Sequence, residues 1–380
     1  MDGGAIEVVG RGPRGEIELA LLADRRATHA GARDRGHGFM QWFHFRLHGE
    51  AGGAANLRIA NAGEATYADA FEGYRVCASY DRERWFRVPT TYDGSSLHIA
   101  HTLEEATIYY AYFAPYSWAR HEALLARAAQ SDRARVERIG SSLLGQPMSL
   151  ITLGEDDGQK PHIWINSRQH PGETMAQWFS EGVLERLLDE EDELSAMLLD
   201  RAVFHLVPNM NPDGSMLGNQ RTNAAGVDLN RTWKDPDPET APEVACVRAE
   251  MLERGVDLFL DIHGDERNPY CFAAGCEGNP SYSERLDRLE DLFMDSLVEL
   301  DTDFQREYGY DRDLPGEGEL GAASNWVGEE LDCLSLTLEM PFKDDANHPD
   351  PEVGWSPERA KGFGRTTLEA VLVSLDSLRE

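Results

Sequence analysis

The chain has 380 residues, of which 41% are hydrophobic, so one large or two medium domains with a substantial core are expected and disorder is excluded. Acidic residues outnumber basic ones by 68 to 36 and the formal net charge is −32, which argues against a nucleic-acid partner because a phosphate backbone would be repelled. No apolar run reaches the roughly 18 residues of a membrane helix and the start lacks a signal-peptide pattern, so we expect no membrane partner and a cytoplasmic location; no pattern indicates an oligomeric state.

Residues 1–118 are predicted to form an N-terminal β-sandwich domain. Short runs that are rich in aromatic and β-branched residues, such as 16–22, 97–101 and 107–113, recur with Gly, Asn or Asp between them. This pattern is typical of an antiparallel sandwich. No catalytic constellation stands out here, and the polar tract 23–38 predicts a surface loop.

Residues 119–380 are predicted to form a second domain of the α/β class. Strands are expected at 148–153, 162–166, 203–207, 258–262 and 333–338, and helices at 121–139, 175–188, 242–254, 282–300 and 357–377. This alternation favours a parallel or mixed sheet with helices on both faces. Active sites in such sheets lie beyond the carboxyl ends of the strands.

His170 and Glu173 lie on a predicted strand-to-helix turn, within residues 167–174 (SRQHPGET). Three residues apart, their side chains fall on the same side of a first helical turn. An imidazole nitrogen and a carboxylate oxygen suit Zn²⁺. The pair is a weak signal on its own, since both residues are common on polar surfaces at helix starts.

His263 is the candidate for a third ligand, because it ends the apolar strand 257–262 and is followed by a glycine. The alternative is a core histidine bonded to backbone. With His170 and Glu173 it would complete a His₂Glu set plus water, which is a recognised catalytic zinc arrangement. The zinc would polarise a scissile carbonyl and lower the pKa of its water.

Glu339 ends the otherwise apolar strand 334–338 and is the candidate general base. Desolvation at such a position raises the pKa of a carboxyl group toward the working range of a base. Taken alone, a glutamate at a strand end is more often simply solvated.

Residues 207–231 hold a turn, Asn-Pro-Asp-Gly, that stops a strand, followed by a polar loop without hydrophobic periodicity. The loop carries Arg221, Asn230 and Arg231. A guanidinium offers a planar fork of donors that suits a carboxylate. Solvated loop arginines are the alternative.

The order of these motifs resembles the zinc metallocarboxypeptidases of the M14 (carboxypeptidase A) type. The matching motifs are His170-x-x-Glu173, the Asn-Pro-Asp-Gly turn, Gly-Asn-x-Arg221, Asp228-Leu-Asn230-Arg231, His263 at a strand end and Thr-Leu-Glu339. The match spans residues 163–342 and is highly specific. Segments 41–47 (QWFHFRL) and 113–117 (FAPYS) are similar to signatures of the cytosolic carboxypeptidase branch, which carries a β-sandwich before its catalytic domain.

The resemblance implies that residues 119–380 are a zinc carboxypeptidase domain that holds one zinc ion. His170, Glu173 and His263 would bind the metal. Glu339 would take a proton from the zinc-bound water and return it to the leaving amine. Asp228 would orient His170, since metal-bound imidazoles usually donate their other N–H to an oxygen.

The resemblance also implies how a substrate is held. Arg221 would stabilise the oxyanion that forms during attack. Asn230 and Arg231 would bind the terminal carboxylate, so that a peptide or protein C-terminus is the expected substrate.

Two departures from the family pattern concern the substrate. Family members bring a tyrosine from a loop roughly twenty residues before the base, but residues 315–323 contain none, and Tyr308 and Tyr310 lie further upstream. Deglutamylating members carry a basic residue in the same stretch, where this chain has Ala322, Ala323 and Ser324. Arg306 and Arg312 could reach in from elsewhere, but a polyglutamate substrate is not supported.

The favoured interpretation is a zinc-dependent metallocarboxypeptidase. A related alternative is a zinc amidohydrolase of N-acyl amino acids, of the aspartoacylase type, which shares the His, Glu, His and Glu positions. It lacks the same carboxylate-binding loop, so Asn230 and Arg231 favour the peptidase. The alternative from another class is a catalytically silent peptide-binding protein, which the full set of ligands and base disfavours.

Overall fold

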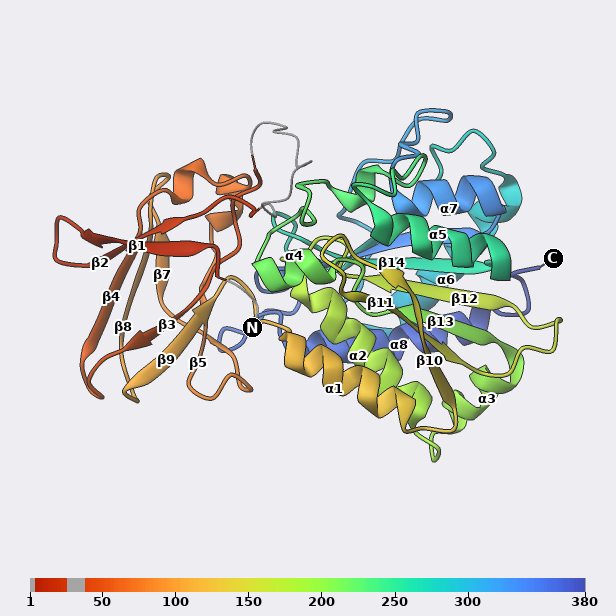
Figure 1. The fold of residues 1–380 in the computed structure, drawn as a ribbon, viewed down its shortest axis with the longest axis horizontal. Helices are drawn as coiled ribbons and strands as arrows, with labels where there is room; N and C mark the ends of the chain where they lie inside the picture. Colours follow the sequence, from red (N-terminus) through yellow and green to blue (C-terminus); the bar gives the residue numbers. More distant parts are fainter. Residues whose placement is uncertain (1–3, 26–37, 380) are drawn as a thin grey trace.

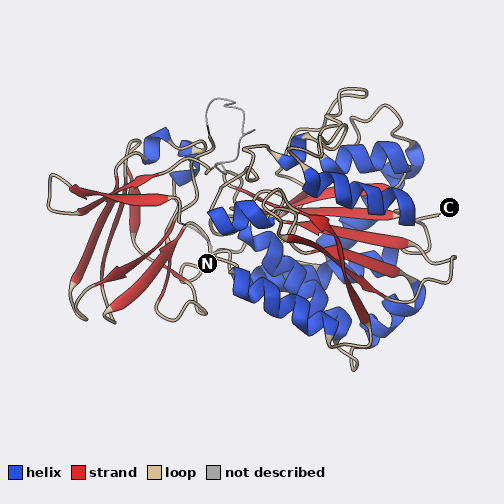
Figure 2. Cartoon of the chain, viewed as in Figure 1, coloured by secondary structure: helices blue, strands red, loops and turns tan. Residues whose placement is uncertain are grey.

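The chain places a lobe made almost entirely of strands beside a lobe in which helices enclose a sheet (Figures 1 and 2). The computed structural model describes residues 4–25 and 38–379, so most of the polar tract predicted as a surface loop lies outside the described residues. Among the described residues, none of the helices combines the length and the hydropathy needed to cross a bilayer.

The first lobe consists of two facing sheets, ordered β1-β2-β4-β8-β7 and β3-β9-β5-β6. The strands are β1 (Ile6–Arg11), β2 (Ile17–Leu21), β3 (His44–His48), β4 (Ala54–Ile59), β5 (Cys77–Ser79), β6 (Phe86–Arg87), β7 (Thr90–Tyr92), β8 (Leu97–Thr102) and β9 (Thr107–Ala111). Two short 3₁₀ turns, η1 (Ala62–Glu64) and η2 (Ala68–Phe71), precede β5. One described pair departs from the predicted antiparallel pattern: β2 and β4 are parallel, because the chain crosses to the other sheet through β3 between them.

The second lobe is built on a seven-stranded mixed sheet, ordered β10-β11-β13-β12-β14-β16-β15. Its strands are β10 (Ala134–Ser141), β11 (Pro147–Leu153), β12 (His162–Ser167), β13 (Val203–Val207), β14 (Leu258–Asp265), β15 (Phe272–Ala274) and β16 (Leu334–Pro341). The four central strands, β13, β12, β14 and β16, run parallel. The catalytic candidates all lie at or beyond the carboxyl ends of these strands.

Helices cover both faces of this sheet (Figure 1). They are α1 (Trp118–Ala129), α2 (Thr174–Leu188), α3 (Glu193–Arg201), α4 (Pro212–Leu217), α5 (Pro242–Arg254), α6 (Glu284–Leu300), α7 (Ala323–Leu331) and α8 (Pro357–Ser374), with a 3₁₀ turn η3 (Leu229–Arg231). The predicted helix 121–139 is wrong in its second half, where the chain turns back and enters the sheet as β10.

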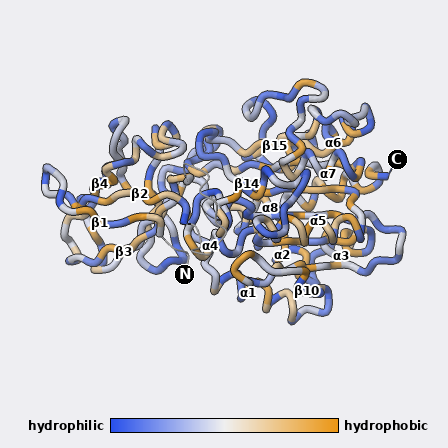
Figure 3. The backbone as a smooth tube through the Cα atoms, turned by 45° about the horizontal axis from the view of Figure 1, so that its top comes forward, coloured by the Kyte–Doolittle hydropathy of each residue, from blue (hydrophilic) through white to orange (hydrophobic). Residues whose placement is uncertain are grey.

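Two hydrophobic cores lie on opposite faces of the sheet because side chains alternate along each strand. Ile163 and Ile165 of β12 point into the core under α2 and α8, whereas Trp164 points into the core under α5 and α7. Figure 3 shows hydrophobic segments gathered in the interior of the lobe and hydrophilic loops at its margin. The core thus fixes the strands whose ends carry the site.

We propose that the boundary between the domains lies between residues 118 and 119, as the composition predicts. The last strand of the first lobe ends at Ala111, and α1 begins at Trp118. In the described chain, neither sandwich sheet contains a strand from beyond this point.

Candidate active site

The turn after β12 carries His170 and Glu173 toward the carboxyl edge of the sheet. It is fixed by Arg168, a non-glycine residue with a positive φ of 60°, whose buried guanidinium donates to Pro171 O at 2.9 Å and to Gln177 Oε1 at 2.7 Å. A side chain in this backbone region is held there only when its surroundings compensate. The turn is therefore a rigid support for both candidate ligands.

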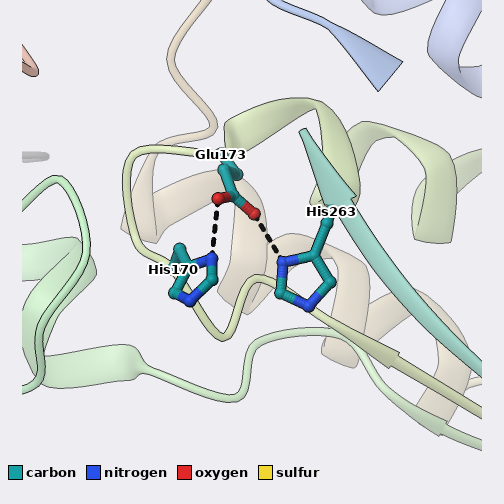
Figure 4. A group of neighbouring side chains, drawn as sticks. All are labelled: His170, Glu173 and His263. Carbon is teal, nitrogen blue, oxygen red and sulfur yellow. Dashed lines mark hydrogen bonds and ion pairs between the residues drawn. The ribbon is translucent and has the colours of Figure 1, made fainter. Parts of the chain in front are cut away.

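Three candidate ligands converge on one point (Figure 4). His170 Nδ1 lies 2.7 Å from Glu173 Oε1, and His263 Nδ1 lies 2.7 Å from Glu173 Oε2. All three are buried, and one ligand atom of each lies within 4.8 Å of the others. Two imidazole nitrogens and a carboxylate in this arrangement fit the donor set of a catalytic zinc.

The other nitrogen of each imidazole faces a carboxylate. His170 Nε2 lies 3.1 Å from Asp228 Oδ1, and His263 Nε2 lies 2.9 Å from Asp261 Oδ2. A carboxylate on the second nitrogen is the usual device that fixes the orientation of a metal-binding imidazole. Both Nδ1 atoms are thereby turned toward the shared centre.

Asp261 is a site residue that the sequence analysis missed. It lies two residues before His263 on β14, is fully buried, and also accepts a hydrogen bond from Gln169 Nε2 at 2.6 Å. Residues at i and i+2 of a strand point to the same face. The Asp-x-His spacing within an apolar strand could therefore have revealed it.

Glu339 lies one strand away from this cluster, because His263 and Glu339 are register partners on the parallel strands β14 and β16. Burial, reinforced by the negative charge of Glu173, raises the pKa of Glu339 well above its ordinary value. Glu173 is equally buried, but the two imidazoles outweigh that burial and lower its pKa. Two carboxyl groups whose pKa values are pushed apart are suited to different roles, a proton acceptor and a charged ligand.

Tyr310 is the upstream tyrosine that lies beside Glu339. Its hydroxyl lies 3.0 Å from Glu339 Oε1 and 2.8 Å from Asp265 Oδ2. Tyr308 instead stacks on Tyr270, with ring centroids 4.5 Å apart. Glu339 Oε2 is buried and has no hydrogen-bond partner among the described residues.

Arg221 is held beside the ligands through Asp228, which connects them. Arg221 Nε donates to Asp228 Oδ2 at 2.7 Å, while Oδ1 of the same carboxylate faces His170. Arg221 Nη1 donates to Tyr67 Oη at 3.1 Å. Burial opposes the positive charge, but Asp228 outweighs it and raises the pKa of Arg221, so the guanidinium stays charged.

Asn230 and Arg231 lie on η3 at the same opening. Asn230 Oδ1 accepts from Ala323 N at 2.7 Å, and its Nδ2 lies 3.3 Å from His263 Nε2. Arg231 is exposed, and Nη1 donates to Asn230 O at 2.6 Å. None of the described carboxylates pairs with Arg231, so its guanidinium is available to an incoming anion.

A cavity of about 550 Å³ opens from these groups. Its wall includes Arg306 and Arg312, the two cations considered for an acidic side chain. Arg306 pairs with Asp291 at 2.6 Å, and Arg312 pairs with Glu277 at 3.0 Å. Both guanidinium groups are thus already engaged by carboxylates.

A buried His₂Glu set with a separate protonatable carboxyl group beside it defines a zinc-dependent hydrolase. Comparison with known proteins narrows this class. Residues 121–360 match the family model of the zinc carboxypeptidases, and residues 1–113 match that of the cytosolic carboxypeptidase N-terminal domain. The chain therefore belongs to the M14 zinc carboxypeptidase family, in its cytosolic carboxypeptidase-like branch, as the motifs predicted.

Similar proteins cover the whole chain. An uncharacterised protein of Zymomonas mobilis is 42% identical over 377 residues, which are 99% of this chain and 96% of its own. The crystal structure of a putative carboxypeptidase A from Shewanella denitrificans has a TM-score of 0.93 at 48% identity, covering 99% of this chain and 97% of that one. A metallo-carboxypeptidase from Pseudomonas aeruginosa, in complex with (2-guanidinoethylmercapto)succinic acid, has a TM-score of 0.93 at 45% identity, covering 100% and 98%.

These findings confirm the predicted fold class, the zinc cofactor and the enzyme class. The protein is a zinc-dependent metallocarboxypeptidase that hydrolyses the C-terminal peptide bond of peptide substrates. Family membership favours this activity over both the amidohydrolase and the silent binding protein.

Proposed function

We propose that Glu339 is the general base of this reaction and that His170, Glu173 and His263 hold the zinc. The observation that carries the proposal is the convergence of both Nδ1 atoms on Glu173, one strand away from the unpartnered Oε2 of Glu339. When bound, zinc would polarise the scissile carbonyl and lower the pKa of a water molecule. Glu339 takes a proton from the attacking water as its oxygen bonds to the carbonyl carbon, and delivers it to the leaving amine as the C–N bond breaks.

We assign the remaining polar groups to the substrate. Arg221 donates to the carbonyl oxygen as negative charge develops there, which is where a fixed cation lowers the barrier most. Asn230 and Arg231 bind the terminal carboxylate, since none of the described carboxylates pairs with the exposed guanidinium of Arg231. Asp228 orients His170 and Arg221 together. Tyr310, which is already bonded to Glu339, contacts the substrate near the scissile bond.

We propose that C-terminal glutamate is not the preferred substrate residue. Arg306 and Arg312 are the cations of the cavity wall away from the catalytic groups, and both are paired with acidic side chains. An incoming glutamate would have to displace one of those carboxylates. Peptides that differ only in their last residue test this point, and fastest cleavage of the glutamate peptide would contradict it.

We propose that the enzyme acts in the cytoplasm on peptides or protein C-termini. The match of its first lobe to the cytosolic carboxypeptidase N-terminal domain supports this location. Fractionation of cells, with detection by antibody, tests it; recovery of the protein outside the cytoplasmic fraction would overturn it.

The roles of the site residues are tested by metal content and by substrate choice. Wild-type protein should bind one zinc per chain, and His263→Ala should bind much less. A peptide with a free C-terminus should be cleaved, whereas its C-terminally amidated twin should not, because Asn230 and Arg231 then have no carboxylate to bind. Equal cleavage of both peptides would remove the assigned carboxylate site.

A further inference from the structure

The loop that carries Arg221 is bound by the N-terminal lobe. Asp24 Oδ1 accepts from Gln220 N at 2.6 Å, and Asp24 Oδ2 accepts from Arg221 N at 3.0 Å and Thr222 N at 2.8 Å. The hydroxyl of Thr222 adds a fourth donor to the same carboxylate, at 2.9 Å. Three consecutive backbone N–H groups therefore depend on one side chain from the other lobe.

These contacts matter because the loop has no regular structure of its own. Helix α4 ends at Leu217, Gly218 adopts a left-handed φ of 78°, and η3 begins only at Leu229. Backbone N–H groups outside helices and sheets need another acceptor. Asp24 provides that acceptor and so fixes the backbone at the residue that bears the catalytic guanidinium.

The same lobe also touches the guanidinium itself. Tyr67 Oη accepts from Arg221 Nη1 at 3.1 Å, and the ring of Phe39 lies 5.4 Å from the guanidinium carbon. From the second lobe, Asp228 accepts from Nε at 2.7 Å. An arginine has several rotatable bonds, so contacts on several sides are needed to hold its planar group in one orientation.

Two further hydrogen bonds join the segment 24–25 of the first lobe to the loop that carries Arg221. Arg25 N donates to Asn219 Oδ1 at 2.7 Å, and Asn219 Nδ2 donates to Arg25 O at 3.0 Å. Asp24 and Arg25 together thus contact all four residues of the loop segment 219–222.

We propose that the N-terminal domain takes part in catalysis, with Asp24 and Tyr67 as positioning residues that hold Arg221 where the oxyanion develops. This inference rests on the role proposed above for Arg221. It explains why a β-sandwich without catalytic groups of its own accompanies the zinc domain. A positioning residue acts only through its target, so its effect must vanish when the target is removed.

The test is a double-mutant cycle in the full-length, zinc-loaded protein, with Tyr67→Phe, Arg221→Ala and the double variant. Tyr67→Phe should lower kcat on the order of ten-fold with little change in KM. The reason is that Tyr67 holds Arg221 in place to stabilise the oxyanion, which forms only in the transition state. In the Arg221→Ala background the same change should have no further effect. The Kd for a phosphonate peptide analogue, measured by calorimetry, should follow the same cycle and needs no turnover.

A matched control is available at the same domain contact. Glu83 Oε2 accepts from Arg120 Nη1 at 3.3 Å, across the two lobes, and neither residue is among the described partners of Arg221, Asp24 or Tyr67. Glu83→Gln should leave kcat unchanged, whereas Asp24→Asn should lower it with retained zinc, since an amide offers only one of the two acceptor oxygens.

The outcomes separate the two proposals. If Arg221→Ala keeps wild-type kcat, the proposed role of Arg221 fails and this inference fails with it. If Arg221→Ala loses activity but Tyr67→Phe and Asp24→Asn do not, only the inference is overturned. Equal losses from Tyr67→Phe in both backgrounds, or a comparable loss from Glu83→Gln, would show a general effect of the domain contact and would also overturn the inference.

Discussion

His263 and Glu339 are register partners on two adjacent parallel strands, so the hydrogen-bond ladder of the sheet places a proposed metal ligand beside the proposed general base. The separation of neighbouring strands is about 4.8 Å. The side chains of His263 and Glu339 are therefore positioned by the sheet itself, whereas His170 and Glu173 come from the turn after β12.

The first prediction concerns the base. Glu339→Gln should lower kcat by about 10² to 10⁴-fold, because an amide cannot accept the proton of the attacking water. The variant should retain its zinc, measured by elemental analysis, since Glu339 is not among the converging ligands. Hydrolysis within ten-fold of the wild-type rate would remove Glu339 from this role.

The second prediction concerns Asp261. Asp261→Asn should weaken zinc binding about 10 to 100-fold, because the amide no longer fixes the imidazole of His263 as a carboxylate does. Competition with a chelator measures this affinity. Asp257→Asn is the control: Asp257 accepts from His162 N at the opposite end of the strand, at 2.7 Å, and zinc affinity should be unchanged. Equal affinities of the Asp261 variant and wild type would contradict the prediction.

The third prediction distinguishes the two loop tyrosines. Tyr310→Phe should reduce kcat/KM about ten-fold, because it removes the hydroxyl that contacts Glu339 and keeps the ring that packs edge-on against Phe272. Tyr308→Phe should have little effect, since its ring stacks on Tyr270 outside this contact. Steady-state kinetics with one peptide suffices, and the reverse order of effects would assign the role to Tyr308.

The fourth prediction concerns the packing of α2 on α8. A Cβ atom at Gly364 would lie 2.4 Å from Phe179 O, so Gly364→Ala should destabilise the protein by about 2 to 3 kcal/mol. At Gly362, on the same helix, the nearest atom is Arg365 Nη2 at 4.0 Å. Gly362→Ala should therefore stabilise by about 0.5 to 1 kcal/mol, because alanine is the better helix former. Denaturant unfolding measures the free energy of unfolding of both variants. Similar changes in the two variants would contradict the close approach of α2 and α8 at Gly364.

The fifth prediction concerns Glu243, which burial gives a pKa of about 7 against an ordinary value of 4.5. The folded state binds this proton more tightly than the unfolded state, so its contribution to stability is greatest at low pH and is lost as pH rises from 4.5 to 7. The loss amounts to about 3 kcal/mol at most. It should be absent in Glu243→Gln and present in Glu253→Gln, an exposed control on the same helix. Urea unfolding at several pH values measures the free energy of unfolding as a function of pH. The same pH dependence in wild type and Glu243→Gln would contradict the prediction.

Local pattern was sufficient to predict the residues that lie at strand ends. Hydrophobic runs predicted β12, β14 and β16, and the polar residues at their ends gave His170, His263 and Glu339. Parallel strands bring such ends to one edge, so distant positions could be assembled without coordinates.

The sequence pattern did not predict an element or a contact where the partner residue is distant in sequence or where the local pattern fits both a helix and a strand. The stretch 134–141 alternates polar and apolar residues and pairs with β11, yet its spacing also continued the helical pattern of α1. Tyr310 lies in a segment without regular secondary structure, so no hydrophobic periodicity predicts its position beside Glu339. Asp24 reaches Arg221 across 197 positions, and nothing near either residue indicates the other.

The placement of ligand and base on one sheet has a consequence for how this enzyme can diversify. The proposed base and one proposed metal ligand lie on paired strands, whereas Arg306 and Arg312 lie outside that ladder. Replacing these two arginines while keeping Tyr310 should therefore alter which C-terminal residue is released while the hydrolytic step survives. The side chains that carry out hydrolysis are thus separate from those that select the C-terminal residue. The substrate selectivity can therefore change while the hydrolytic groups stay the same.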